Sequence, residues 1–456
     1  MQQIGFDPAN ALEALRQLPR AAAVFALYGA DAHAEPYIGR TPNLRGRVER
    51  LLQPSAKHPK RLQLAGRVRR IEWRLTGSDF ESLLLQFELL QKVYGAKALE
   101  RMHLRAPAFV RFLGSNPYPR ITVTNKPSQR EAEWAYGPFP SRAAAERYAE
   151  EALKLFLLRR CVDELNPDPS FPGCVYSEMK MCLAPCYKGC TDERYAEESA
   201  AVEDFFATRG ESKLVVLRGE RDKASADLEF ESAATLHAQV QKVESVRALA
   251  SELVRPLSRL RAVILQPAAV GPSGASAPAV EVSVFLFEKG SFRGPVQFST
   301  LGMRIQNEQS GSTSLFPQPL ALEAVPEGTE NREQGSGTEG PGTEGPGTQG
   351  PGTETRDRTT ELGPAAPSAP SRQGRGVLEA RMEAALSELM QGPGKPDAVQ
   401  RQGHLALLKR WYYRPETRRV GEIFFPDAEG RWPVKAILRG AGRLAAKMVA
   451  GPARQS

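Results

Sequence analysis

The sequence predicts an α+β protein built from several small sheets and helical segments. Short apolar runs that alternate like strands are followed by amphipathic helical segments along most of the chain. A length of 456 residues corresponds to two to four domains, and a hydrophobic content of 41% is enough for real cores. Residues 305–376 interrupt this pattern with a composition that cannot bury enough apolar surface to form a core.

The first unit begins with a short helix over residues 10–18 and continues as a β-hairpin. Apolar runs at 24–28 and 37–38 flank the turn-rich segment 29–36, and Gly39 closes the second strand. Four arginines follow, several of them on one face of a short helix: Arg40, Arg45, Arg47 and Arg50. A tyrosine beside arginines suits a phosphodiester-cleaving site, because the phenol can act as a base and guanidinium groups bind phosphate. Arginines on a helix are more often a solvated face, so the pattern alone is weak.

Further elements are expected in order along the chain. The basic segment 55–70 adds Lys57, Lys60 and Arg61 to the candidate DNA-binding residues. A strand at 71–75 precedes a helix that Asp79 caps and that runs through Val93. Beyond it we expect strands at 108–112 and 120–123, a turn at 136–140, a helix at 141–158, a helix at 192–206, and a helical pair over 213–253 broken near 227–230.

The C-terminal part returns to strand character over 259–300, in two pieces separated by a loop rich in Gly, Pro, Ser and Ala. The pentad repeat at 337–354 lies within the predicted disordered insert. Helical periodicity recovers over 377–413, and the sequences RRVGEIFFPD and WPVKAILRG are predicted as strand-like pieces. We therefore expect domains at 1–104, 105–205, 206–254, and 255–304 with 377–456, the insert occupying 305–376.

The charge balance is basic, with 61 Lys and Arg against 53 Asp and Glu. This favours a polyanionic partner, and nucleic acid over membrane, because neither a long apolar run nor a basic amphipathic anchor is apparent. A mildly basic protein without such a partner would have a similar balance. The N-terminal segment lacks an apolar signal core, so we expect a cytoplasmic protein that is not exported.

All five cysteines fall within residues 161–190. Their crowding argues against a disulfide framework and for a local site in a reducing compartment. Cys161, Cys174, Cys182 and Cys186 are spaced C-x12-C-x7-C-x3-C, with prolines that place them on tight turns. Four converging thiolates suit a structural zinc and an iron–sulfur cluster equally well, and the pattern leaves the choice open.

Taken together, these motifs resemble the N-terminal portion of UvrC-type excinuclease subunits, and also the shorter Cho endonuclease. The resemblance rests on LPRAAAVF (18–25), YIGRTPNLRGR (37–47), YGPFP (136–140), the four-cysteine spacing ending in CLAPC (182–186), and LEFESAATLHAQV (228–240), which is similar to a UVR helical hairpin. It covers about residues 10–250 in the family's order. Residues 259–300 and 377–440 resemble more loosely the connecting region after that hairpin.

The resemblance implies a GIY-YIG nuclease fold, a small mixed sheet with flanking helices. Its second tyrosine would be Tyr37, with Gly39 as the motif glycine, Arg40 at the adjacent lysine position and Arg47 as the arginine that stabilises phosphoryl charge. It also implies a four-iron, four-sulfur cluster on the four cysteines. A divalent Mg or Mn ion would be needed if the nuclease site is active.

Several positions depart from the family pattern. The first tyrosine falls on Phe25 and the metal-binding glutamate on Gln86, and the asparagine after that helix has no match. A neutral amide is a poor divalent-metal ligand because it contributes no charge. Glu81 and Glu88 lie nearby but at helical offsets that turn them away from position 86. We also expect neither the family's RNase H-like second nuclease nor its helix–hairpin–helix units, and hence no 5′ incision.

The family's UVR hairpin binds a UvrB-type helicase, which implies partner contacts at Leu228, Phe230, Glu231 and Ala234. An ordinary intradomain hairpin or a homodimer contact is the alternative. Three functions remain open: a DNA-binding repair subunit with a degenerate nuclease site, an active Cho-like endonuclease that makes one 3′-side cut, and a regulatory adaptor that uses only the hairpin. Phe25 and Gln86 favour the first.

Overall fold

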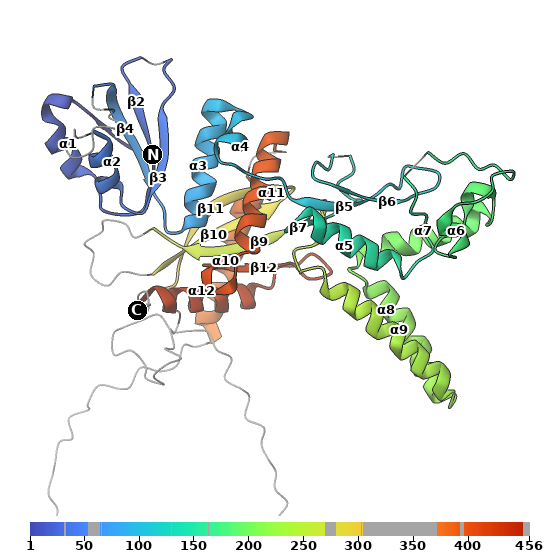
Figure 1. Cartoon of the computed structure of the whole chain (residues 1–456). Coiled ribbons are helices and arrows are strands. Elements are labelled where there is room, and N and C mark those ends of the chain that lie inside the picture. The colour runs from blue at the N-terminus through green and yellow to red at the C-terminus, as the bar shows by residue number, and fades with distance from the viewer. Residues whose placement is uncertain are drawn as a thin grey trace, which may run out of the picture.

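The protein was examined as a computed structural model of the 456-residue chain. The structure describes residues 1–31, 33–52, 64, 66–128, 130–162, 164–269, 280–301, 303, 372–392 and 396–449. The predicted loop near 270–279 and the predicted insert up to residue 371 lie outside these residues. Figure 1 shows three sheet regions along an elongated body, from which a helical hairpin projects.

The N-terminal sheet has the strand order β1-β4-β2-β3 and is antiparallel throughout the described residues, where the resemblance implied a mixed sheet. Its strands are β1 (Gln2–Gly5), β2 (Ala23–Gly29), β3 (Tyr37–Thr41) and β4 (Val68–Leu75). The predicted hairpin is confirmed by the antiparallel pairing of β2 with β3. After the short turn η1 (Pro8–Asn10), helices α1 (Ala11–Gln17) and α2 (Leu44–Leu52) pack on one face, around Phe25, Leu27 and Val48.

Helix α3 (Asp79–Tyr94) lies against β3 and β2, on the face of the sheet that presents Ile38. The predicted cap is off by one residue. Ser78 is the N-cap, because its hydroxyl accepts the backbone N–H of Glu81, while Asp79 is the first helical residue. This shift frees the Asp79 carboxylate for ion pairs. A short helix, α4 (Lys97–Arg101), follows.

The second sheet has the order β6-β5-β7-β8, with strands β5 (Ala108–Phe112), β6 (Ile121–Thr124), β7 (Ala135–Phe139) and β8 (Arg255–Pro256). The predicted turn at 136–140 is wrong, because residues 135–139 form a fully buried strand. Pro138 is tolerated since it lies where the β5–β7 register shifts, so its missing N–H breaks no regular ladder. Gly137 is required there, because a Cβ would lie 2.5 Å from Cδ1 of Phe109.

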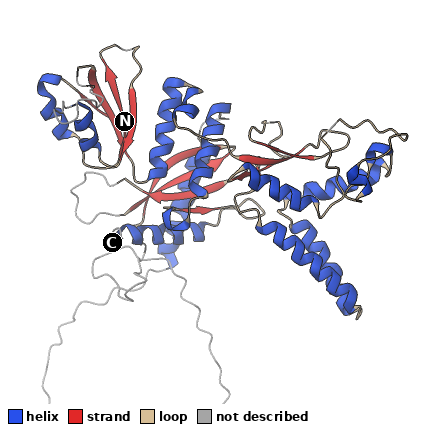
Figure 2. Ribbon diagram, viewed as in Figure 1, coloured by secondary structure: helices blue, strands red, loops and turns tan. Residues whose placement is uncertain are grey.

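A largely helical region follows the second sheet. Its elements are α5 (Arg142–Leu153), α6 (Val175–Glu178), the turn η2 (Pro185–Tyr187), α7 (Asp192–Ala207), α8 (Glu211–Ala226) and α9 (Phe230–Ala248). The predicted break in the helical pair is confirmed between residues 226 and 230. Figure 2 shows α8 and α9 running side by side away from the body, so that their far end has no neighbouring element.

The C-terminal sheet has the order β11-β10-β9-β12. Its strands are β9 (Ala262–Pro267), β10 (Glu281–Glu288), β11 (Ser291–Ser299) and β12 (Glu422–Phe424). Helices α10 (Arg372–Met390) and α12 (Val434–Val449) cover one face, while α11 (Ala398–Tyr412), followed by the turn η3 (Glu416–Arg418), covers the other together with α3.

Two sequence predictions for this region are wrong. Helix α10 begins at Arg372, inside the predicted insert. WPVKAILRG leads into α12 instead of forming a strand, because Ile437, Leu438, Ala441 and Leu444 recur at helical spacing and pack together on the sheet.

Helix α3 joins the first and third sheets. Its buried residues Phe80, Leu83 and Phe87 share a core with α11 and the third sheet. A Cβ at Gly403 of α11 would lie 2.0 Å from Cζ of Phe87, and one at Gly77 would lie 2.1 Å from the Pro267 carbonyl oxygen. Both glycines therefore allow an approach that a larger residue would prevent.

We expect stability in this core to depend on pH through His404. The ring is fully buried, its Nδ1 accepts the Phe292 backbone N–H at 2.9 Å, and burial lowers its pKa to about 4. Unfolded histidine protonates near pH 6.5, so the stabilisation is complete above that pH and is lost as pH falls towards 4. The loss is on the order of 3 kcal/mol.

Urea unfolding followed between pH 7.5 and 4.5 measures this loss. In His404→Gln, whose amide cannot titrate, the fall over this window should be smaller by about that amount. An identical pH dependence in the variant would contradict the assignment to His404. His103→Gln is a matched control, because that ring is exposed to solvent.

Candidate functional site

Tyr37 and Arg47 meet on the face of the N-terminal sheet that α1 and α2 cover. Tyr37 begins β3 and Arg47 lies on α2, and Nη2 of Arg47 donates a hydrogen bond to the Tyr37 hydroxyl oxygen at 3.2 Å. Both side chains are partly exposed. The structure thus brings together two of the residues that the sequence proposed for phosphate chemistry, a phenol and a guanidinium group that solvent can reach.

Gly39 is needed because aromatic rings cover its backbone. It pairs with Phe25 across the β2–β3 ladder, and a Cβ would lie 2.9 Å from Cζ of Phe25 and 3.3 Å from Cε1 of Tyr37. The rings of Phe25 and Tyr37 are 6.0 Å apart. Phe25 is fully buried, so at the first-tyrosine position the chain has a core ring without a hydroxyl. Tyr28 lies on the other face of the sheet, where Cζ of Arg70 is 4.3 Å from the centre of the Tyr28 ring.

Arg40 lies on the face of the sheet opposite to Tyr37. It is three residues further along β3, and alternation points it to the opposite face of the sheet. There it forms an ion pair with Asp79, which Arg414 also contacts at 2.8 Å. Burial raises the pKa of Asp79, but the hydrogen bond from Arg414 and the charge of Arg40 outweigh this effect and lower the pKa overall. Arg40 therefore fastens β3 to α3.

The other predicted DNA-binding residues have different environments. Nε of Arg45 donates to the Leu18 carbonyl oxygen at 2.7 Å, which ties α2 to the end of α1. Arg50 is exposed, and its Nε donates to the Gly46 carbonyl oxygen within α2. Lys57, Lys60 and Arg61 lie outside the described residues. On the Tyr37 face, Arg47 and Arg50 are the exposed arginines of α2 that remain for a phosphate.

The residues at the expected metal position do not fit a divalent metal. Gln86 is a half-buried amide on α3 and forms no hydrogen bond or ion pair with any residue that the structure describes. Glu81 is buried, and its Oε2 accepts the Gly77 backbone N–H at 2.8 Å, which stabilises the start of α3. Burial raises the pKa of the Glu81 carboxyl group. Glu88 is exposed two residues beyond Gln86. No carboxylate replaces the missing glutamate in the place where the family pattern puts it.

The four predicted cysteine ligands lie close enough to influence one another. Burial and the neighbouring Cys161, Cys174 and Cys186 thiols raise the pKa of Cys182. Burial also raises the pKa of Cys186. Although burial opposes it, the backbone N–H groups of Ser177 and Tyr176 lower the pKa of Cys174. None of the five cysteines forms a disulfide.

The turn that carries Cys186 has two residues in the left-handed backbone conformation. Ala184 and Lys188, with φ of 53° and 59°, flank the turn that carries Cys186, and such left-handed residues cost about 1 kcal/mol each. The buried Arg159 donates from Nη1 to Sγ of Cys161 at 3.6 Å. The donor set therefore has the chemistry of a thiolate site. Among the described residues, however, no three His, Cys, Asp or Glu side chains are arranged closely enough to hold a metal ion.

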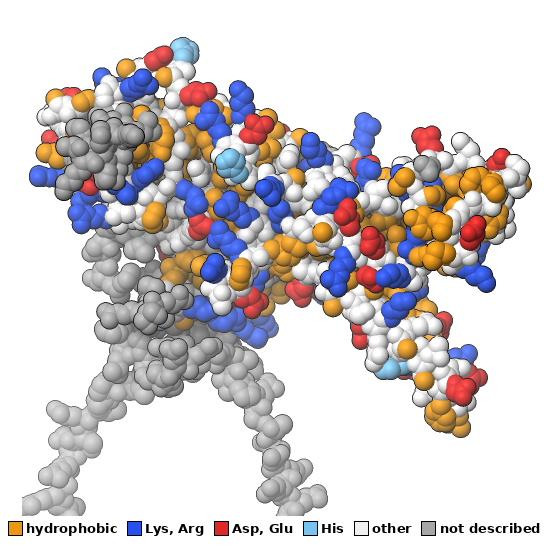
Figure 3. All heavy atoms as spheres, viewed as in Figure 1, with side chains coloured by type: hydrophobic (Ala, Val, Ile, Leu, Met, Phe, Trp, Pro, Cys, Tyr) orange, Lys and Arg blue, Asp and Glu red, His pale blue; other side chains and the backbone are white. Residues whose placement is uncertain are grey.

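The far end of the α8–α9 hairpin exposes large apolar side chains. Leu228 is 71% exposed and Phe230 67% exposed, and Glu231 and Ala234 are exposed beside them. Leu228 has φ of 62°, so a tight left-handed turn presents it to solvent. Figure 3 shows hydrophobic atoms at this tip and around the cysteine region, whereas charged side chains are scattered over the central body.

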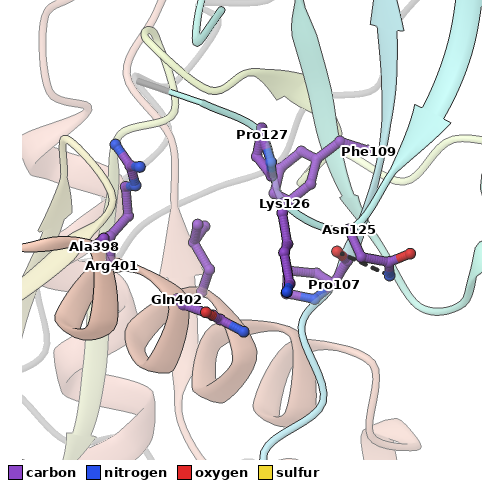
Figure 4. A pocket seen from close by; sticks show the side chains of 9 residues that line it. Pro107, Phe109, Asn125, Lys126, Pro127, Ala398, Arg401 and Gln402 are labelled. Carbon is purple, nitrogen blue, oxygen red and sulfur yellow. Dashed lines mark hydrogen bonds between the residues drawn. The ribbon is translucent and has the colours of Figure 1, made fainter. Parts of the chain in front are cut away.

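A small cavity of about 190 Å³ lies between α11 and the second sheet. Figure 4 shows Ala398, Arg401 and Gln402 on one side, with Phe109 and the segment Asn125–Pro127 on the other. Lys126 and Arg401 make its rim basic, and no acidic residue lines it. None of the sequence-predicted site residues lines it either.

Sequence reasoning missed the roles of Asp79, Arg414 and Arg159. Asp79 was read as a cap, and Arg414 is 335 residues away in sequence. Arg159 follows a predicted helix and looked like a surface residue, yet it is 1% exposed. Its nearness to Cys161 in sequence was the one available signal.

Comparison with known proteins agrees with this geometry. Residues 24–94 match the family described as a UvrC-like GIY-YIG domain, and residues 109–205 match the UvrC/Cho excinuclease middle domain. The first match contains β2, β3 and α3, and the second contains the cysteine region. The first matched region also contains Tyr37 and Arg47. In these two regions the chain is similar to UvrC-type excinuclease subunits.

Several curated relatives support the same assignment. UvrABC system protein C of Alcanivorax borkumensis is 28% identical over 211 residues, which are 46% of this chain and 34% of that protein. The proteins of the same name from Saccharophagus degradans and Carboxydothermus hydrogenoformans are 26% and 28% identical, over 39% and 38% of their lengths. The chain thus aligns with less than half of each of these relatives. No solved structure matches it, and none of the described helices is both long and apolar enough to cross a membrane.

Proposed function

We propose that this protein acts in nucleotide excision repair as a UvrC-like subunit that binds damaged DNA, docks a UvrB-type helicase and has a weak or inactive GIY-YIG site. One observation carries the proposal. Tyr37 and Arg47 remain hydrogen-bonded as a candidate phosphate-binding pair, while Gln86 stands at the position of the metal-binding glutamate. The nearby Glu81 accepts the Gly77 backbone N–H at the start of α3.

The pair can bind a phosphodiester without cutting it. The Arg47 guanidinium group has donors beyond the one that contacts Tyr37, and guanidinium groups pair with phosphate oxygens in a fixed geometry. The Tyr37 hydroxyl can donate to a second phosphate oxygen. Hydrolysis further requires stabilisation of the leaving oxygen, which a metal ion supplies in such sites, and the residues near Gln86 do not fit one.

The cysteine region supports an iron–sulfur cluster held by Cys161, Cys174, Cys182 and Cys186. The supporting observations are that burial and the neighbouring thiols raise the pKa of Cys182 and of Cys186, and that the buried Arg159 donates to Cys161. A four-iron, four-sulfur cluster would cross-link the loops around η2, which otherwise have little regular structure. A zinc site would use the same thiolates, and a measurement of bound iron and zinc distinguishes the two alternatives.

The α8–α9 hairpin supports docking of the helicase. Its exposed tip offers Leu228 and Phe230 to a partner, with Glu231 and Ala234 on the adjoining surface. Exposed aromatic and aliphatic side chains of this kind commonly dominate the binding energy of an interface.

A second candidate is an active Cho-like endonuclease that makes one 3′-side cut, which the preserved Tyr37–Arg47 geometry favours. A third is an adaptor that uses only the hairpin. Its weakness is that it gives no role to the phosphate-binding pair or to the cysteines.

We expect binding without incision. With lesion-bearing duplex, Mg²⁺ or Mn²⁺ and the helicase partner, anaerobically purified protein should bind DNA and leave it intact. Arg47→Ala should weaken binding about tenfold, because a hydrogen bond to a charged group contributes about 1.5 to 3 kcal/mol. Gel-shift and nicking assays on the same substrate measure both properties.

Arg142→Ala is the matched control, because this exposed arginine of α5 is already paired with Glu146. Metal-dependent nicking by the wild type that disappears in Arg47→Ala would instead establish the active endonuclease. Gln86→Glu tests the reason for inactivity, since it restores the missing carboxylate and should introduce some metal-dependent nicking.

Docking is expected to depend on the hairpin tip. Phe230→Asp should weaken binding to a UvrB-type helicase about 30-fold, the effect of losing an interface anchor of about 2 kcal/mol. Because Phe230 is 67% exposed, the fold should be unchanged. Val215→Asp, on an equally exposed part of α8, should bind normally. Equal binding by wild type and Phe230→Asp in calorimetry would reject the docking surface.

The cluster has its own test. Protein purified without oxygen should be brown and contain iron and sulfide, and Cys182→Ser should lose the visible absorption. Cys190→Ser is the matched variant and should keep its colour if four cysteines suffice. A colourless protein that carries zinc would overturn the iron–sulfur assignment.

A further inference from the structure

Helix α12 carries a row of basic side chains that the strand prediction for WPVKAILRG had hidden. Lys435, Arg439, Arg443 and Lys447 follow one another at intervals of four residues, and all four are exposed. Side chains at this interval lie on the same side of a helix. The helix contains no acidic residue between Val434 and Val449. The row is therefore uniformly positive along its whole length.

The opposite side of α12 is fixed in the core. Ile437, Leu438, Ala441 and Leu444 are buried against the third sheet and α10. Gly440 allows close contact, because a Cβ there would lie 2.4 Å from Cζ of Phe424. The packed face holds the helix in place, so the basic row is presented in one orientation.

The charges of this row are largely uncompensated. Arg443 donates two hydrogen bonds to the carboxylate of Glu422. Lys435, Arg439 and Lys447 form no ion pair with any residue of the described chain. On α5, by contrast, Arg142 pairs with Glu146, and Lys154 pairs with Glu151. In Figure 3, Lys and Arg side chains gather along the lower edge of the body, where Figure 1 shows α12.

We propose that this row, Lys435, Arg439, Arg443 and Lys447, binds the phosphate backbone of duplex DNA. The row spans about 18 Å, the rise of 12 helical residues, which corresponds to about five phosphates of one strand. This inference rests on the proposed DNA-binding function and names a second contact surface, separate from Tyr37 and Arg47. An anionic membrane is the other polyanion, but α12 has already buried the apolar face that membrane-surface helices insert.

The test is the salt dependence of DNA binding by the full-length protein. The triple variant K435Q/R439Q/K447Q should bind duplex DNA at least about tenfold more weakly at 0.1 M salt, and the slope of log K against log salt should decrease by about 2.7, or 0.9 per lost phosphate contact. The loss should be the same with and without a lesion, because backbone contacts carry no base information. Fluorescence anisotropy over a salt series measures all three quantities.

The matched control is R142Q/R147Q/K154Q, which removes the same charge from exposed positions of α5 and its C-cap residue Lys154. It should keep the wild-type slope. Urea unfolding should show both triple variants as stable as the wild type, because all six side chains are exposed. An α12 variant that loses no more affinity than the α5 variant would show only a general charge effect and overturn the inference.

The outcomes separate this inference from the proposed function. If the wild type binds DNA and the α12 variant has the same affinity and slope, the α12 surface is wrong while the proposed function stands. If the wild type binds no DNA, both fail. If it binds vesicles containing phosphatidylserine more tightly than DNA, and the α12 variant loses that binding, the partner is a membrane and the inference is overturned.

Discussion

The architecture depends on helix α3 being buried from two sides. One side lies on β2 and β3 of the N-terminal sheet, while Phe80, Leu83 and Phe87 enter a core that includes α11 and the C-terminal sheet. Phe80 alone contacts three aromatic rings edge-on or tilted, at centre distances of 5.1 to 5.6 Å. Burying a phenylalanine contributes about 1.5 to 3 kcal/mol, so this helix holds the sheets together as one body.

This constraint changes what the nuclease-like site can do. Asp79 begins α3 and is held by Arg40 from β3 and by Arg414 from the end of α11. The basic residue after the motif glycine is therefore used to join two parts of the protein. Tyr37 and Arg47 lie on the opposite face and keep their own contact. Strand alternation thus places Arg40, which joins β3 to α3, and the Tyr37–Arg47 pair on opposite faces of the sheet.

The surfaces available to partners are also separated. The apolar tip of the α8–α9 hairpin projects from the body (Figure 1). The basic row lies on α12, which packs on the C-terminal sheet. Helix α9 packs in a core through Val240 and Val243, beyond its exposed tip, and helix α12 packs in a core through its other side, at Ile437 and Leu444. Such an arrangement allows a protein partner and a phosphate backbone to be bound without competition for one surface.

The sequence by itself determined the α+β class, the hairpin around Gly39, the helical pair broken before Phe230 and the resemblance to UvrC, because these depend on local periodicity and on residues close together in the chain. It misjudged residues 136–140 as a turn, because glycine and proline favour turns, whereas the register shift between β5 and β7 accommodates both residues within a strand. Only the tertiary structure decided that Arg40 pairs with Asp79, that Arg414 joins them, and that Lys435 to Lys447 form one exposed row. Those facts depend on which face each element buries, and burial is set by neighbours that are distant in sequence.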